Sequence, residues 1–446
     1  MKKSIVLYTV ALTVILICAM LFSMGCDYYP RTLVSCVVAD GSGGTIIVYE
    51  FDRNDSDEDI RIQRRGADGN VLWDNTLFTS QSNRSSVEGM TGDGEGNIII
   101  NWTVLIPQES EEGRPYSERA TVARVDAQGQ VLWQKDVHKK DVQAIYDDSG
   151  SAIIIWPDME GFCAQRIDGE GNLLWEKCFS VSGYGLRLVI NEMGEALILR
   201  DNLDNNDFAV QKLGSSSEVL WGQEGVHIKY LVTASEQRPQ LISDGSGGAI
   251  ITWAELIGEV GQPSFVWVLR TGADGEVLWK CPVRNLTSVI NTYTRVVADG
   301  SGGATVVWED LRRGMALYAQ KVNADGQAVW QENGIPVCTN LPEVSPRFEA
   351  FGDGDGSVVV AWIDGDRKLY AQRLDTMGKK QWGADGILIA TGVCDLPVKI
   401  AQDGQGGVII GWATGWQVHH PQEAYVQRMD QDGKPLWGEK GIRLDQ

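Results

Sequence analysis

The sequence predicts an all-β fold: an eight-bladed β-propeller of four-stranded antiparallel blades, preceded by an N-terminal signal or anchor segment. Three observations predict it. A unit of 44 to 55 residues recurs eight times, each copy holds two glycine-rich turns between apolar runs, and a tryptophan follows the second turn at a fixed distance. Internal periods of this length are typical of propellers and solenoids.

The first turn has the pattern Asp-Gly-x-Gly-Gly, with variations. It begins at Asp40, Asp93, Asp147, Asn191, Asp244, Asp299, Asp353 and Asp403. Nine residues after each start comes Tyr49, Trp102, Trp156, Arg200, Trp253, Trp308, Trp362 or Trp412. Glycine supplies the positive φ that tight hairpin turns need. The run after the turn is apolar on successive residues, so the predicted strand is buried on both faces.

The second turn precedes a tryptophan in every copy: Trp73, Trp133, Trp175, Trp221, Trp279, Trp330, Trp382 and Trp437. Four residues earlier stands a glycine, or Ser217 in the fourth copy. Nine residues earlier stands a basic residue: Arg64, Arg124, Arg166, Lys212, Arg270, Lys321, Arg373 or Arg428. A turn centred near its Asp-Gly places the basic residue opposite the tryptophan, with room for a cation–π contact. We interpret both residues as structural.

Two hairpins in each copy form a four-stranded meander, and radial stacking of such sheets leaves only short edges. The predicted boundaries are 1–25 for a signal peptide, 26–32 for a tether and 33–446 for the propeller. The last copy ends at Gln446 with its motifs intact, so we expect the ring to close between residue 33 and the C-terminus. A linear β-solenoid is the alternative, with unusually long rungs.

The N-terminal segment has a different composition. Lys2 and Lys3 precede an apolar run from Ile5 to Phe22, and the sequence S-M-G-C ends at Cys26. A basic start, an apolar stretch and small residues before a cleavage site indicate an export signal. The small residue before Cys26 resembles the bacterial lipobox, which implies cleavage there and lipidation of the thiol, although Ser23 stands where leucine is usual. The alternative is an uncleaved signal anchor.

Charge and cysteine content narrow the class of protein. The net charge is −21, which argues against nucleic acid and anionic lipid as electrostatic partners. The cysteines after Cys26 are scattered without a C-x-x-C pair, which argues against a disulfide framework and against zinc. A bridge between Cys338 and Cys394, each just before a new copy, stays open as a hypothesis.

The second hairpin, as in A-R-V-D-A-Q-G-Q-V-L-W at 123–133, resembles the tryptophan-docking repeat of quinoprotein-like propellers. The resemblance covers about a dozen residues in each copy and matches the glycine-to-tryptophan spacing. The aspartate-to-glycine spacing is one residue short, and the first hairpin lies outside the pattern. That superfamily includes quinone-dependent dehydrogenases and a lipoprotein subunit of the bacterial outer-membrane protein assembly machine.

The resemblance to the dehydrogenases implies a quinone on a disulfide of adjacent cysteines, with calcium beside it. This chain has no adjacent cysteines, so we expect no quinone. The hairpin also resembles the sialidase Asp-box, with a different glycine-to-tryptophan interval. No catalytic residue is carried over from either group.

Catalytic signatures such as G-x-S-x-G, H-E-x-x-H and the P-loop do not occur in the sequence. We therefore expect no enzyme and no cofactor. Calcium is a possible exception, because carboxylates cluster in D-G-D-G-S at Asp353 and in the run Asp52–Asp59. The alternative interpretation of the turn at Asp353 is an Asx-type turn, and that of the run Asp52–Asp59 is a solvated loop.

Binding residues are expected on the connections between the second and third strands, which differ in length from copy to copy, whereas the two turns are nearly uniform. Loops on a rigid scaffold concentrate function. The candidates on these connections are Asp57, Arg114, Tyr116, Trp416 and His419. Neutral variation in loop length is the alternative interpretation.

The function predicted from sequence is a lipid-anchored, exported propeller that acts as a protein- or glycan-binding or scaffold module of the cell envelope, as a monomer. The alternative is a secreted hydrolase or lyase that acts on polysaccharide. Carboxylates and basic residues at the channel mouth favour the enzyme, whereas a channel of Gly, Ala and Val disfavours it. A structural surface protein with an acidic exterior is the third hypothesis.

Overall fold

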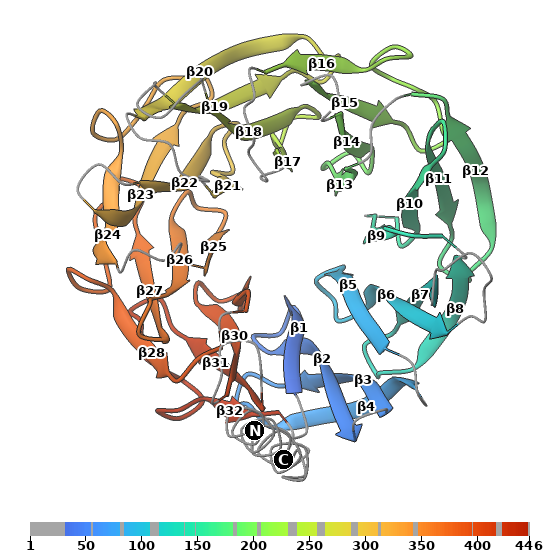
Figure 1. Cartoon of the computed structure of the whole chain (residues 1–446), viewed down its shortest axis with the longest axis horizontal. Helices are drawn as coiled ribbons and strands as arrows, with labels where there is room; N and C mark the ends of the chain where they lie inside the picture. The colour runs from blue at the N-terminus through green and yellow to red at the C-terminus, as the bar shows by residue number, and fades with distance from the viewer. Residues whose placement is uncertain are drawn as a thin grey trace, which may run out of the picture.

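The computed structural model is a closed ring of eight sheets (Figure 1). It describes residues 32–54, 57–80, 84–107, 116–137, 139–147, 149–181, 185–202, 207–230, 239–256, 264–286, 293–310, 314–341, 347–394, 396–415 and 422–444. Each sheet contains four antiparallel strands that are consecutive in the chain. The described residues therefore confirm the eight-bladed β-propeller.

The strands follow the repeat. Blades 1 to 4 consist of β1 (Thr32–Ala39), β2 (Thr45–Asn54), β3 (Asp57–Arg65), β4 (Val71–Thr79); β5 (Arg84–Gly92), β6 (Ile98–Pro107), β7 (Tyr116–Val125), β8 (Val131–Val137); β9 (Gln143–Tyr146), β10 (Ala152–Asp158), β11 (Gly161–Ile167), β12 (Leu173–Phe179); β13 (Arg187–Ile190), β14 (Ala196–Asn202), β15 (Asp207–Leu213) and β16 (Val226–Lys229).

Blades 5 to 8 consist of β17 (Gln240–Ser243), β18 (Ala249–Leu256), β19 (Ser264–Thr271), β20 (Val277–Leu286); β21 (Thr294–Ala298), β22 (Ala304–Asp310), β23 (Met315–Val322), β24 (Ile335–Leu341); β25 (Arg347–Gly352), β26 (Val358–Ile363), β27 (Lys368–Leu374), β28 (Ile387–Thr391); β29 (Lys399–Gln402), β30 (Val408–Thr414), β31 (Glu423–Met429) and β32 (Ile442–Arg443). Between residues 32 and 444, outside the gaps, no helix is long and apolar enough to span a membrane.

The first turn of each copy is built around its aspartate. In blade 1, Asp40 Oδ1 accepts hydrogen bonds from the backbone N–H of Ser42 at 2.9 Å and of Gly44 at 2.8 Å. Gly41 and Gly43 have φ of 78° and 89°, a region that side chains rarely adopt. The turn sequence therefore fixes the hairpin locally, as the spacing predicts.

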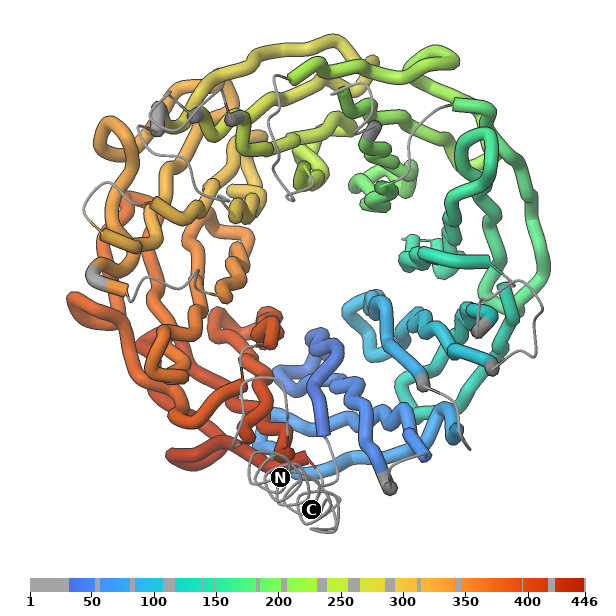
Figure 2. Tube along the Cα trace, viewed as in Figure 1, coloured from blue at the N-terminus to red at the C-terminus, as the bar shows by residue number. Residues whose placement is uncertain are grey.

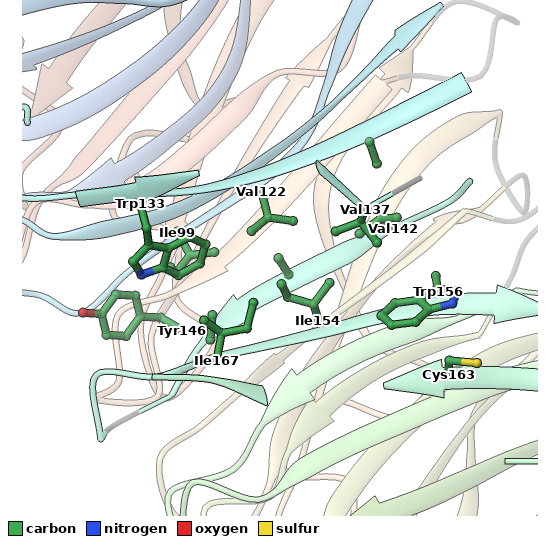
Figure 3. Close-up of a cluster of buried hydrophobic side chains, with 13 residues drawn as sticks. Ile99, Val122, Trp133, Val137, Val142, Tyr146, Ile154, Trp156, Cys163 and Ile167 are labelled. Carbon is green, nitrogen blue, oxygen red and sulfur yellow. The ribbon is translucent and has the colours of Figure 1, made fainter. Parts of the chain in front are cut away.

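The hydrophobic core lies between blades. One cluster joins Ile99 and Val122 of blade 2 to Ile154 and Trp156 of blade 3 (Figure 3). The second strands contribute on both faces, and every residue of β22 is buried. Because a single blade leaves these side chains exposed, each blade depends on its neighbours for burial.

The ring closes without strand exchange. Strands β1 to β4 form one sheet and β29 to β32 another, and Figure 2 shows the first and last blades side by side. A hydrophobic cluster crosses this seam and includes Val34 and Tyr49 of blade 1 with Trp437 and Leu444 of blade 8. The expected closure between the first and last copies is confirmed.

The expected register of the second hairpin is confirmed in four blades, where Arg64 pairs with Trp73 and the equivalent residues pair at Trp133, Trp175 and Trp279. The cation–π expectation is wrong for most pairs. Among the eight pairs, all of them described, such a contact is found between Lys212 and Trp221, at 5.6 Å. Six of the other cations bind the aspartate of the first turn in their own blade and a carbonyl of the next blade, whereas Arg124 binds the next blade.

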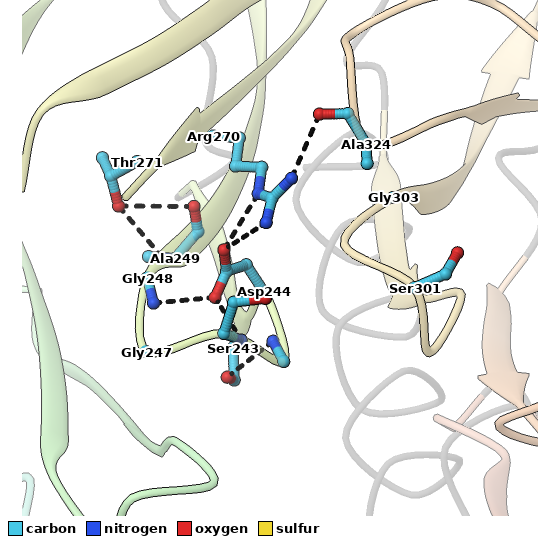
Figure 4. A network of polar contacts seen from close by, with 12 residues as sticks. Ser243, Asp244, Gly247, Gly248, Ala249, Arg270, Thr271, Ser301, Gly303 and Ala324 are labelled. Carbon is cyan, nitrogen blue, oxygen red and sulfur yellow. Dashed lines mark hydrogen bonds and ion pairs between the residues drawn. The ribbon is translucent and has the colours of Figure 1, made fainter. Parts of the chain in front are cut away.

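The basic residue, the aspartate and the tryptophan together form a clamp onto the next blade, and Figure 4 shows the contacts of Arg270 with Asp244 and Ala324. In blade 5, Arg270 lies 2.8 Å from Asp244 Oδ2 and donates to the carbonyl of Ala324 in blade 6 at 3.1 Å. Trp279 Nε1 donates to the same carbonyl at 2.7 Å. A Cβ on Gly326 would lie 2.8 Å from the Trp279 ring, so glycine is required where the ring docks. We call this arrangement the docking clamp.

The docking clamp recurs around the ring. Seven of the tryptophans donate to a carbonyl of the following blade: Trp73, Trp175, Trp221, Trp279, Trp330, Trp382 and Trp437. At the seam, both Trp437 and Arg428 donate to the carbonyl of Ala67 in blade 1. The seam is therefore held by the same contacts as the interior interfaces.

Trp437→Ala at the seam and Trp382→Ala between blades 7 and 8 are expected to lower the free energy of unfolding by similar amounts. Both rings are almost fully buried, and loss of a buried aromatic ring costs about 3–5 kcal/mol. Chemical unfolding followed by tryptophan fluorescence measures the two changes. A Trp437→Ala variant as stable as the parent would contradict closure of the ring by docking.

Candidate functional site

The propeller has two unlike faces. In a meander, both turns of each copy lie at one end of the blade, and the connections from second to third strand and from one blade to the next lie at the other. We call these ends the turn face and the loop face. Thr32 begins β1 at the loop face, because β1 runs from there to the turn at Asp40.

On the turn face, side chains are engaged in holding the ring together. The carboxylates of Asp40, Asp147, Asp244, Asp353 and Asp403 bind the basic residue of their own blade. Since those cations also bind the next blade, few of these polar groups are left for an external ligand.

The interface between blades 2 and 3 departs from this pattern. Arg124 donates a hydrogen bond to the carbonyl of Gly169 at 2.6 Å, and its guanidinium lies 5.5 Å from the centre of the Tyr146 ring. Trp133 Nε1 is buried without a hydrogen-bond partner. A cavity of about 430 Å³ lies beside Arg124, and it contains the carboxylates of Asp93 and Asp147. Both of these are capped by backbone N–H groups of their own turns.

Blade 4 departs from the repeat in its core. Arg200, which replaces the aromatic residue of other blades, is 2% exposed and donates to the carbonyl of Glu224. In the same blade Lys212 binds Glu195 at 2.8 Å, because Asn191 replaces the turn aspartate. Burial lowers the pKa of the Arg200 guanidinium, and the carboxylates of Glu224 and Asp207 partly offset this.

The channel is lined by the innermost strand of each blade and is not restricted to Gly, Ala and Val. Arg295 binds Glu349 at 2.6 Å across blades 6 and 7. A cavity of about 330 Å³ next to β5, β9 and β13 is lined in part by Glu88, Asp141 and Arg187. Burial, and the nearby carboxylate of Asp141, raise the pKa of Glu88.

A cavity of about 640 Å³ forms a groove at the outer rim between blades 7 and 8. Its polar residues include Gln422, Glu423 and Lys440, and its aromatic residues are Trp412 and Tyr425. We call it the rim groove. It reaches the loop face, since Glu423 begins the third strand of blade 8 and Gln422 directly precedes it.

Of the sequence candidates for binding, Asp57 has a described side chain, and it does not line this groove. Arg114, Trp416, His419 and the lipidation candidate Cys26 lie outside the described residues. Tyr116 begins β7, and its side chain is also outside the description. Asp57 begins β3 opposite Asn54. These five binding candidates therefore stay predictions.

The rim groove was not predicted, although its residues carry a signal. Trp412 occupies the fixed aromatic position of the eighth copy, and a tyrosine stands three residues before its docking arginine, as at Tyr318 and Tyr370. This recurring pair predicts a stacked contact inside the blade. Only the neighbouring blade decides whether a groove opens beside it.

The acidic run Asp52–Asp59 contributes to the contact between blades 1 and 2. Glu58 accepts from the backbone N–H of Ser85 at 2.6 Å. Nearby, Glu50 accepts from the N–H of Val87 at 2.9 Å. Within the described part of the chain, no group of three or more His, Cys, Asp or Glu side chains is arranged to hold a metal ion. Within this run, Glu58 thus has a structural use.

The turn D-G-D-G-S contains a coupled pair of carboxyls. Asp355 accepts a hydrogen bond from the backbone N–H of Ser357 at 2.7 Å. In blade 1 the equivalent hydrogen bond, from Gly44, goes to Asp40, the aspartate that begins the turn. Burial, together with the hydrogen bond to Asp355, raises the pKa of Asp353 to about 6, and the same hydrogen bond lowers the pKa of Asp355 to about 2. Arg373 binds Asp353 as in the other clamps.

The cysteines correct one expectation. Cys163 and Cys178 form a disulfide across β11 and β12, where the two residues are directly paired. Cys178 lies on the exposed outer strand, whereas Cys163 is buried. The hypothetical bridge between Cys338 and Cys394 is wrong, since both are buried and neither is in a disulfide.

Comparisons with known proteins give a fold likeness. No family model matches the chain, and no curated protein matches it. Solved structures similar to it include puromycin hydrolase, with 14% identity and a TM-score of 0.43, which covers 77% of this chain and 52% of that one. The chain therefore spans about half the length of that hydrolase.

Two further structures are matched over nearly all of their own chains. The BP39L lectin from Burkholderia pseudomallei shares 11% identity with a TM-score of 0.49, over 75% of this chain and 93% of the lectin. The β-propeller domain of the Trilobed protease from Pyrococcus furiosus shares 12% with a TM-score of 0.43, over 80% and 97%. At these identities the likeness concerns the fold alone, and the chain is an eight-bladed β-propeller.

Asp355→Ser is expected to raise the free energy of unfolding relative to the parent, and this gain should increase as the pH rises. In the parent, native Asp353 keeps a proton between about pH 4 and pH 6 that the unfolded chain has released, so the stability due to this pair falls across that range. A serine at this position, like Ser42 two residues after Asp40, has no carboxyl to share a proton with Asp353, so the loss of stability between about pH 4 and pH 6 disappears. The gain of the variant over the parent should grow by on the order of 1 kcal/mol from pH 4.5 to pH 7.5, after allowance for solvent screening.

Urea unfolding at the two pH values measures this difference. The matched reverse change is Ser301→Asp, which places a second carboxyl beside Asp299 in blade 6 and should produce the opposite trend. Equal effects of Asp355→Ser at both pH values would exclude a shared proton in the native turn.

Proposed function

We propose that this propeller is an exported binding or scaffold module of the cell envelope, tethered through a lipid on Cys26, and that it binds a protein or glycan on its loop face. The observation that supports this most is the difference between the faces. The turn-face side chains hold the ring together, whereas the connections on the loop face vary in length and the rim groove opens toward them.

Two features support export. The basic and apolar N-terminal segment ends in S-M-G-C at Cys26. The Cys163–Cys178 disulfide has one partner on an exposed strand, and disulfides persist mainly in oxidising compartments. Together they favour an extracytoplasmic location for the ring.

The tether bears on which partners fit. Six residue steps separate Cys26 from Thr32, so a fully extended tether reaches about 20 Å. Since β1 starts at the loop face, an anchor at Cys26 holds that face toward the membrane. A partner of the loop face would then be a membrane-proximal protein or a glycan near the cell surface.

The channel offers an observation that favours the enzyme alternative. Glu88 has a raised pKa and shares a cavity with Asp141 and Arg187, the kind of charged lining that a polysaccharide hydrolase or lyase needs. These residues come from different blades, and the proposal of a binding module assigns them no catalytic role. Turnover of a polysaccharide by the purified protein would replace that proposal.

Replacement of residues 108–115 with a short turn like Met159–Glu160 of blade 3 is expected to abolish capture of an envelope partner while the thermal midpoint changes little. The exchange leaves the core and the docking clamps untouched. Affinity capture with the lipid-free domain, followed by mass spectrometry, measures the loss. A matched control is Gln128→Ala, an exposed change on the turn face, which should retain the partner. Identical partners for both variants would remove this loop from the proposed site.

Cys26→Ala is expected to leave the protein without a lipid. Metabolic labelling with a fatty acid and the mass of the mature chain measure the result. The variant should be released unlipidated or stay unprocessed, while Cys36→Ala should mature as the parent does. Normal maturation of Cys26→Ala would eliminate the lipid anchor without affecting the binding proposal.

A further inference from the structure

The rim groove owes its shape to the short outer strands on both of its sides. Strand β32 has two residues and pairs only with Tyr425 and Val426 of β31, whereas β4, β8, β12 and β20 have seven to ten residues. On the other side, β28 ends at Thr391. Beyond these pairs, the N–H of Leu444 donates to the carbonyl of Ala424 at 2.9 Å, and the groove of about 640 Å³ lies between the start of β31 and the end of β28.

An aromatic wall forms one side of the rim groove. Trp412 is 3% exposed and stacks on Tyr425, with ring centres 5.8 Å apart and an angle of 11°. A Cβ on Gly441 would lie 3.0 Å from the far edge of the indole, so the indole is wedged in place. The partly exposed Tyr425 ring is thus backed by a fixed surface, and it lines the groove.

The polar groups beside this wall are held in position. Glu423 accepts the Tyr425 hydroxyl at 2.8 Å and also binds Arg443. A carboxylate oxygen has a second lone pair, so Glu423 still accepts from a ligand. The Gln422 amide, next in sequence, adds a donor and an acceptor to the same wall.

The charges around the rim groove balance. Two carboxylates, Glu423 and Glu439, are matched by two cations, Lys440 and Arg443. Although the chain as a whole is strongly acidic, this site neither attracts a cation nor an anion by net charge. The ligand it fits is neutral, with one apolar flat side and several hydroxyl groups.

We propose that the rim groove binds a neutral sugar ring, with the C–H face of the pyranose on Tyr425 and its hydroxyls on Glu423 and Gln422. The proposal deepens the binding function above and rests on it for the choice of a glycan over a protein partner. The cavity volume lies in the range of small-ligand sites and accommodates a disaccharide. Aromatic stacking supplies affinity, and the oriented carboxylate supplies specificity for hydroxyl position.

The test is ligand-detected NMR with the lipid-free protein and a panel of methyl glycosides of glucose, galactose, mannose and N-acetylglucosamine, with maltose and cellobiose as disaccharides. At least one sugar is expected to bind with a Kd in the millimolar range or tighter. Glu423→Gln, which keeps the shape of the side chain, should raise the Kd of that sugar at least tenfold. Tyr425→Ser should abolish binding.

The matched control is Tyr370→Ser, since Tyr370 stacks on Trp362 in blade 7 as Tyr425 does on Trp412, at the same 5.8 Å. It should bind the sugar as the parent does. No binding of any panel sugar at 20 mM, or equal binding by the parent and Glu423→Gln, would overturn the proposal. The loop exchange replaces none of the described residues that line the rim groove, so it tests the partner of the loop face separately from the sugar, and each proposal can fail without the other.

Discussion

The docking clamp is the contact on which the rest of the structure depends. A four-stranded blade is apolar on both faces of its inner strands and has no stable fold unless both faces are covered. In five blades the tryptophan and the cation bind the same carbonyl in the second turn of the next blade, as Trp279 and Arg270 do, and the glycine of that turn admits the ring. This sets the distance and angle between blades. Seven of the eight tryptophans donate to the next blade, including Trp437 at the seam, and between blades 2 and 3 Arg124 donates to the carbonyl of Gly169.

The same contact divides the surface into two parts. Aspartates and arginines of the turn face satisfy each other, so their charge is neutralised locally and holds blades together. Sequence variation is tolerated at the opposite end, where no clamp constrains the connections. The site between blades 7 and 8 arises there because the outer strands are short. In this fold, the residues available to contact a ligand are therefore those that do not hold neighbouring blades together.

Sequence patterns predicted the hairpins well because turn chemistry is local. The register that sets Arg166 opposite Trp175 also sets Cys163 opposite Cys178, so the disulfide was implicit in the predicted hairpin. The cation–π prediction was wrong because an arginine beside a buried carboxylate gains more from an ion pair than from a ring. For binding, loop length predicts a face of the ring, and this stays a prediction because Arg114, Trp416 and His419 lie outside the described residues.

The sequence by itself determined the number of blades, the position of both turns and, in four blades, the register of the second hairpin, because each depends on glycine conformation and apolar spacing within about 50 residues. Tertiary structure decided which carbonyl each tryptophan meets, where Arg200 finds its partners, and how Tyr425, Glu423 and Lys440 share one groove. Those contacts join separate strands or blades, and their distances follow from strand lengths and ring geometry. No local pattern encodes them.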